Sequence, residues 1–153
     1  MRISENMAVY SAVLPQASKT SATETDAVSM KEVGNLSIVI LTGDFGSPAD
    51  TPAVVLRQST AVAKTSEKAL GFDFVYVGSS TDDTLLKTAV TSDTFNLAEN
   101  SVYVIEVSDQ ELDVTNVFDC VHCEIAAAGQ GIAIAVLILG SEMRTTVKTI
   151  LTD

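Results

Sequence analysis

The chain has 153 residues, of which 46% are hydrophobic and 19% charged, a composition that suits one folded domain with a continuous core. Its formal net charge of −11 repels phosphate backbones and anionic lipid surfaces, so we expect no nucleic-acid partner and no membrane partner. No apolar run reaches the ~18–20 residues of a membrane span, and the first residues lack the apolar segment of a secretory signal.

Residues 1–27 are predicted to form an extended N-terminal arm. The stretch 14–27 is rich in Ser, Thr and Ala and shows neither a helical nor a strand period of apolar residues. Apolar side chains such as Met7, Tyr10 and Leu14 are enough to anchor an extended segment on another surface. We expect the arm to be mobile in isolation, and we expect the arm and the tail residues 144–153 to fasten the domain to neighbours; the alternative is a leader without consequence.

Residues 28–140 carry the pattern of an all-β domain. Short runs rich in Val, Ile, Thr and aromatic residues are separated by turn residues at the spacing of about 8–12 residues that sandwiches and barrels show. Strands are predicted at 27–31, 36–41, 53–59, 72–77, 85–90, 94–97, 102–107, 117–125 and 132–139. The pattern predicts an antiparallel β-sandwich of about eight strands, followed by a C-terminal tail at 141–153.

Two predicted strands alternate clearly between two faces. The apolar faces are predicted to consist of Leu70, Phe72, Phe74 and Tyr76 in the first strand, and of Tyr103, Ile105 and Val107 in the second, opposite Val102, Val104 and Glu106. By contrast, 36–41 and 132–139 are apolar on both faces, which indicates central strands or strands that another subunit covers.

Two local signals complete the predicted elements. Ser108 is followed three residues later by Glu111, a capping box that predicts one helical turn over 109–113. The glycine-containing segment 126–131 predicts a hairpin between the last two strands.

Cys120, His122 and Cys123 form the segment nearest in type to a metal or redox site. A tetrahedral zinc site takes four ligands from two separated clusters, and His122 is the single histidine, so we predict no metal site. A redox C-x-x-C begins a helix, whereas this one lies in a predicted strand, where its cysteines point to opposite faces. We interpret both as small hydrophobic residues near the core, in a chain that folds in a reducing cytoplasm.

Acidic residues gather in three turns, none of which matches the loop pattern of a calcium site, and we interpret them as solvated turns. They are Asp82 and Asp83; Asp109, Glu111 and Asp113; and Asp44 and Asp50. No nucleophile can be paired with His122, and the glycines at 129–131 lack the lysine of a phosphate loop. The sequence therefore predicts no catalytic, cofactor-binding or metal-binding residue, and no enzyme.

Residues 28–139 resemble the head decoration, or cement, proteins of tailed bacteriophages. The similarity lies in Val54 to Leu70 (VVLRQSTAVAKTSEKAL), Val102 to Val107 (VYVIEV), Glu111 to Val114 (ELDV) and Phe118 to Val121 (FDCV). The resemblance implies a jelly-roll-like sandwich that associates with itself into dimers or trimers. It also implies binding to the major capsid protein across subunit boundaries on the capsid exterior.

Multivalent binding gives this function a physical basis, because a weak contact repeated over a shell gains avidity from effective concentration. The alternative function is a carbohydrate-binding or receptor-binding sandwich of a phage particle, which needs aromatic residues in loops, whereas most of those here fall on predicted strands. A cupin-type enzyme is the weakest alternative, since its metal site takes several histidines.

Overall fold

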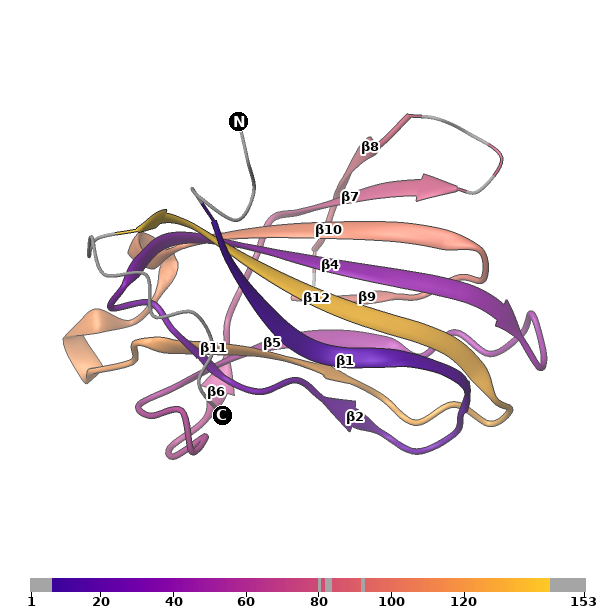
Figure 1. Cartoon of the computed structure of the whole chain (residues 1–153), viewed down its shortest axis with the longest axis horizontal. Coiled ribbons are helices and arrows are strands. Elements are labelled where there is room, and N and C mark those ends of the chain that lie inside the picture. The colour runs from indigo at the N-terminus through magenta and orange to yellow at the C-terminus, as the bar shows by residue number, and fades with distance from the viewer. Residues whose placement is uncertain (1–6, 80, 82–83, 92, 144–153) are drawn as a thin grey trace.

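The computed structural model describes residues 7–79, 81, 84–91 and 93–143. Its strands form two antiparallel sheets that lie face to face, and two single 3-10 turns, η1 (Asp109–Glu111) and η2 (Val114–Asn116), join β10 to β11 (Figure 1). In the described part of the chain, no helix has the length and apolarity to cross a membrane. The predicted all-β sandwich is confirmed.

Sheet A has six strands, which follow one another in space as β1 (Ala8–Lys19), β12 (Ile132–Met143), β4 (Val33–Phe45), β10 (Ser101–Ser108), β7 (Phe74–Ser79) and β8 (Leu86–Ala89). Sheet B runs β2 (Thr23–Glu24), β11 (Cys120–Ile125), β5 (Ala53–Ser59) and β6 (Lys68–Ala69), while β3 (Val28–Ser29) pairs with β11 and β9 (Thr94–Asn96) pairs with β5.

Four strand pairs are nested along the chain: β1 with β12, β2 with β11, β4 with β10, and β5 with β9. The first and third pairs lie in sheet A, and the second and fourth lie in sheet B, so the chain passes repeatedly between the sheets. This is the connectivity of a jelly roll, built here from eight strands. The β7–β8 hairpin extends sheet A beyond β10 (Figure 1).

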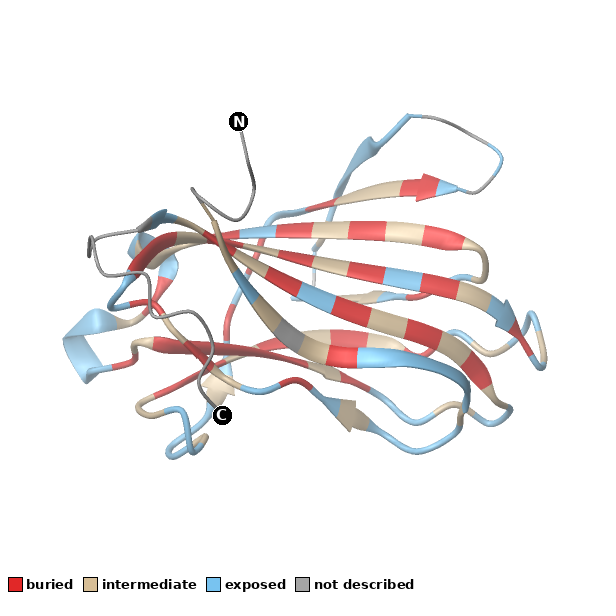
Figure 2. Cartoon of the chain, viewed as in Figure 1, coloured by how far each residue is buried: buried red, intermediate tan, exposed pale blue. Residues whose placement is uncertain are grey.

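The core lies between the sheets and is built from every second residue of the long strands. Buried and more exposed residues alternate along β4, β10 and β12 (Figure 2). Leu36, Ile38 and Ile40 of β4 are fully buried, and Val54 and Leu56 of β5 meet them from sheet B. The alternation of Tyr103, Ile105 and Val107 with the opposite face of β10 is confirmed, as these three residues are buried.

The predicted apolar face of residues 70–76 is wrong at its second half. Leu70 and Phe72 are buried, but they precede β7, which begins at Phe74. Within β7 it is Val75 that enters the core, whereas Phe74 is 43% exposed on the other side of the sheet. The chain leaves the regular strand path between Gly71 and Asp73, so an alternation counted across this break changes face.

The predicted N-terminal arm differs most from the structure. Residues 8–19 form β1, an edge strand that pairs with β12 from Ala8 opposite Gly140 to Lys19 opposite Ile132. Val13 of this strand is part of the core. The jelly roll therefore includes residues 8–27, and only 1–6 of the arm and 144–153 of the tail lie outside the described residues, while 141–143 end β12.

Two local predictions have opposite outcomes. The capping box is confirmed, because the Ser108 backbone N–H donates to Glu111 Oε2 at 2.7 Å and the Ser108 hydroxyl accepts from the Gln110 N–H. The hairpin between the last two strands is wrong. β11 lies in sheet B and β12 in sheet A, so residues 126–131 cross from one sheet to the other.

Candidate functional site

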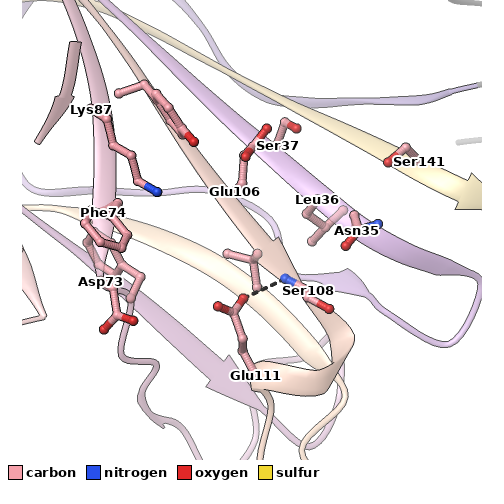
Figure 3. A pocket seen from close by; sticks show the side chains of 13 residues that line it. Asn35, Leu36, Ser37, Asp73, Phe74, Lys87, Glu106, Ser108, Glu111 and Ser141 are labelled. Carbon is pink, nitrogen blue, oxygen red and sulfur yellow. Dashed lines mark hydrogen bonds between the residues drawn. The ribbon is translucent and has the colours of Figure 1, made fainter. Parts of the chain in front are cut away.

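A groove of about 500 Å³ lies at the outer side of sheet A, where β4, β10 and β7 pass close to η1 (Figure 3). Outward-pointing residues of the three strands form its floor, and the segment before β7 and the η1 turn form its rim. The lining side chains are those of Asn35, Leu36, Ser37, Phe72, Asp73, Phe74, Tyr76, Lys87, Glu106, Val107, Ser108, Glu111 and Ser141.

The groove combines aromatic surface with hydrogen-bonding groups. The Lys87 ammonium lies 3.8 Å from the centre of the Phe74 ring and 5.9 Å from that of Tyr76. Three carboxylates line the groove, from Asp73, Glu106 and Glu111, and Glu111 is held by its bond to the Ser108 N–H. Such a groove suits a polyhydroxylated or cationic group that stacks on an aromatic ring.

Beside this groove, the outer face of sheet A is apolar. We define the outer apolar face by the outward residues of β1, β12, β4 and β10, namely Val9, Ala135, Leu137, Leu139, Val39, Leu41, Val102 and Val104. Cross-strand pairing places Val104 opposite Val39, and Val39 opposite Leu137, in one continuous row. Leu41 and Leu137 are 47% and 38% exposed, so no described part of the chain covers this face fully.

Charge is scarce on this surface. Glu106 is the one charged residue that points outward in the three central strand segments. These segments are Asn35 to Leu41, Val102 to Ser108 and Ala133 to Ser141. Such a low density of charged residues is unusual for the surface of a chain whose net charge is −11. The two predicted strands that are apolar on both faces, 36–41 and 132–139, are the central strands β4 and β12 of this sheet.

Cys120 and Cys123 are buried on opposite faces of β11, as predicted from their spacing. Cys123 belongs to the core, whereas the Cys120 thiol lies on the other face and donates to Asp119 Oδ1 at 3.0 Å. Burial raises the pKa of both thiols to about 12. Neither cysteine is a thiolate near neutral pH, and the thiolate is the form that attacks or binds metal.

His122 lies between the cysteines on the outer face of β11 and is fully buried there. Neither ring nitrogen has a hydrogen-bond partner among the described residues. Burial lowers the pKa of His122, while the Glu67 carboxylate acts in the opposite direction. Glu24 and Glu124 also lie close to the ring. Glu124 follows His122 by two residues on the same face of β11, whereas Glu24 and Glu67 could not be found from sequence because they come from distant segments.

The acidic turns serve local structure where the structure describes them. Asp50 accepts from the Gln130 N–H, Asp44 accepts from the Asn100 amide, and Asp113 accepts from Asn116 and pairs with Lys68. Asp82 and Asp83 lie outside the described residues. Asp44, Asp50 and Asp113 therefore each have a partner within the chain.

No protein-family model matches the sequence, and no curated protein is significantly similar to it. Among solved structures, the chain is similar to the SPBc2 prophage-derived protein YomS, with 11% identity and a TM-score of 0.49 over 88% of this chain and 94% of that one.

Two further structures are more distant. A Bacillus endospore appendage protein from a family of disulfide-linked pili has 14% identity and a TM-score of 0.37, over 89% of this chain and 88% of that one. The Tobacco streak virus coat protein has 9% identity and a TM-score of 0.35, over 97% and 96%. Function does not follow from fold at such distances, so the case for function rests on the residues of this chain.

Proposed function

We propose that this chain is a structural virion protein that binds the outer surface of a phage capsid and stabilises it by bridging major capsid protein subunits. It does so as a cement or decoration protein, in the form of a homodimer or homotrimer. It folds in the host cytoplasm, joins the capsid exterior and performs no catalysis.

The outer apolar face of sheet A is the observation that carries this proposal. The cores of protein interfaces are enriched in apolar side chains and depleted of charge, as this face is. We assign the face to a second copy of this chain, because two acidic molecules approach each other at the lowest electrostatic cost where neither is charged. A row such as Val104, Val39 and Leu137 gives each copy a flat, self-complementary surface.

Self-association in turn supports the capsid role. An oligomer presents the same capsid-binding surface several times, and a capsid lattice repeats the complementary site at fixed spacing. Weak individual contacts then add through effective concentration and can reach an avidity ~10²–10⁴ above that of one contact. The sequence resemblance of residues 28–139 to phage decoration proteins points in the same direction.

The first experiment measures self-association by sedimentation velocity over a range of protein concentrations. The wild-type chain should sediment as a dimer or trimer, and Leu137→Glu should sediment as a monomer that still unfolds cooperatively, because Leu137 is on the surface of the single chain. Val114→Glu is the matched control, since Val114 is 69% exposed on η2, which contributes no residue to this face. A wild-type monomer at every concentration would remove the proposed interface.

The second experiment tests the capsid role separately. Particles that contain this chain should show it by cryo-electron microscopy on the outside of the shell, in fixed stoichiometry with the major capsid protein. Absence from purified particles, or a position inside the shell, would contradict the decoration role even if the chain forms oligomers.

The groove favours a second candidate function, a carbohydrate-binding or receptor-binding module of a phage particle. Phe74 is exposed beside hydroxyl and carboxylate groups, an arrangement that suits a sugar ring better than the buried aromatic residues expected from sequence. Titration of purified host surface polysaccharide into the protein tests it. Binding that disappears in Phe74→Ala and persists in Val114→Ala would favour this function over the decoration role.

A further inference from the structure

The outer face of sheet B holds the one histidine of the chain in an unusual environment. His122 points away from the core, since its neighbours Val121 and Cys123 are core residues and successive side chains of a strand point to opposite faces. Its side chain is nevertheless 0% exposed, and both ring nitrogens are buried without a hydrogen bond among the described residues. Buried polar groups in folded proteins nearly always have a partner, and a bound ion or water commonly supplies it where the protein itself does not.

Three carboxylates converge on this imidazole. Glu67 Oε1 lies 3.7 Å and Glu124 Oε1 lies 4.0 Å from His122 Nε2. Glu24 stands directly opposite Glu124 in the β2–β11 pair, and one potential ligand atom each from Glu24, His122 and Glu124 lie within 4.8 Å of one another. Like charges placed directly opposite on neighbouring strands destabilise a sheet unless a cation lies between them.

Two basic side chains neutralise part of the negative charge of these three carboxylates. Arg57 Nε forms an ion pair with Glu124 Oε2 at 2.8 Å, and Lys64 Nζ forms one with Glu24 Oε2 at 2.8 Å. In the described part of the chain, Glu67 has no ion pair besides its contact with His122. With a neutral imidazole, three carboxylates face two cations, so one negative charge remains beside the unpartnered ring nitrogen.

We propose that His122, Glu124 and Glu24, with Glu67 within reach, form a binding site for a zinc ion. Imidazole nitrogen and carboxylate oxygen are ligands that Zn²⁺ accepts in tetrahedral geometry. Two ligand atoms that each lie about 2.1 Å from a shared tetrahedral ion are roughly 3.4 Å apart. Small side-chain rotations would therefore bring Glu67 Oε1, at 3.7 Å, and Glu124 Oε1, at 4.0 Å, to this distance from His122 Nε2. Arg57 and Lys64 then orient the ligating carboxylates from outside, as outer-shell partners of metal ligands do.

Such an ion would fasten separate segments of sheet B to one another. Glu24 lies on β2, Glu67 lies in the segment between β5 and β6, and His122 and Glu124 lie on β11. These segments are far apart in the sequence, and β2 is a strand of only two residues. The site is structural in kind and is independent of the assembly role proposed above.

The experiment uses the full chain after removal of metal with a chelator. Isothermal titration with Zn²⁺ should show one ion per chain, and the unfolding temperature should rise on Zn²⁺ addition but not on addition of Mg²⁺. Glu24→Gln should weaken Zn²⁺ binding about 10-fold or more. This variant should fold, because the Glu24 side chain is half exposed. Asp113→Asn, which also removes a lysine-paired carboxylate, is the matched control and should bind Zn²⁺ like the wild type.

Cobalt substitution identifies the ligands. Co²⁺ bound at this site should show visible absorption of nitrogen and oxygen ligation without the near-ultraviolet thiolate band, and Cys120→Ser should leave Zn²⁺ affinity unchanged. Three results would each overturn the proposal. The first is the absence of Zn²⁺ binding at about 100 µM. The others are a Zn²⁺ affinity that Glu24→Gln does not alter, and Zn²⁺ binding that is lost only in Cys120→Ser.

Discussion

The cysteines illustrate how the environment of single residues decides their chemistry. Cys120 and Cys123 have the spacing of a redox pair, but the strand sends them to opposite faces, where each is buried. Cys123 is surrounded by the core, and the Cys120 thiol donates to a carboxylate, which favours the protonated form. Both therefore lie in surroundings that favour the protonated thiol.

The first prediction follows from the pKa of about 12 to which burial raises both thiols. Native protein should not react measurably with Ellman's reagent (DTNB) near pH 8, because the thiolate fraction is negligible and neither sulfur is accessible. Both cysteines should react in guanidinium chloride. Rapid labelling of either cysteine in the native protein would show that β11 is more open than the structure has it.

The second prediction concerns Asp113, whose carboxylate caps η2. The Lys68 ammonium and the Asn116 side chain hold the pKa of Asp113 below its usual value. Because the folded-state pKa is the lower one, this stabilisation is present above the unfolded pKa of about 3.9 and is lost as pH falls through the folded pKa. Urea unfolding should show that Asp113→Asn has lower stability than wild type at pH 7 and a smaller loss on acidification below pH 4.

A thermodynamic cycle separates the ion pair from the helix cap. Lys68→Gln should remove the part of the pH dependence that comes from the ion pair and leave the bonds from Asn116 in place. An acid limb that is identical in wild type and in Asp113→Asn would show that other carboxylates control acid unfolding.

At the scale of secondary structure, β1 behaves as a protected edge strand. Its pairing with β12 is interrupted by register shifts between Ser11 and Val13, Val13 and Gln16, and Gln16 and Lys19. Bulges of this kind twist an edge and discourage pairing with other molecules. They also break the two-residue alternation that would reveal a strand, which is why residues 14–19 look like part of an irregular arm in the sequence.

The third prediction tests whether β1 belongs to the folded body. Val13→Ala should lower the free energy of unfolding by about 2 kcal/mol, because two buried methyl groups are lost, whereas Leu14→Ala should cost less than about 0.5 kcal/mol. Val13 is 7% and Leu14 71% exposed, so neighbouring residues serve as test and control in urea unfolding. A chain lacking residues 1–26 should lose its cooperative transition. Retention of that transition would restore the interpretation of this segment as an arm.

The strands of the central body could be predicted because their sequences keep a regular period and end at turn residues. Predicted strand 53–59 coincides with β5, and 102–107 with the middle of β10. Strand 117–125 begins later than predicted, at Cys120, because Val117 has a φ of 67° that ends η2 and is incompatible with a strand. The hairpin expected at 126–131 failed because turn residues indicate a turn but not which sheet the chain enters next.

At the scale of the whole molecule, neither the groove nor the approach of Glu24 and Glu67 to His122 could be predicted from sequence, although Glu124 shares its face of the strand by spacing alone. Glu24, Glu67 and His122 become neighbours through the pairing of β2 with β11 and through the segment that follows β5. No spacing in the sequence encodes such a meeting. The outer apolar face was partly visible in advance, because two strands without a polar side can only be central or covered.

The fourth prediction connects the charge of the whole chain to its association. Two copies of net charge −11 repel each other, whereas the proposed interface itself holds little charge. Salt screens the repulsion and leaves apolar contact intact, so the dissociation constant should fall several-fold between about 20 and 150 mM NaCl. Sedimentation equilibrium measures it, with Leu137→Glu as the monomeric reference. Weaker association at higher salt would indicate an interface built on ion pairs.

The position of β12 between β1 and β4 has a consequence for how the protein is made. β1 is synthesised early but has no other neighbour in sheet A, and one edge of β4 stays unpaired until β12 leaves the ribosome. Closing this sheet joins segments from the two ends of the jelly roll, which makes the folding transition slow. Meanwhile the open edge of β4 accepts a β12 from any copy, so crowded nascent chains are expected to exchange this strand and form swapped dimers.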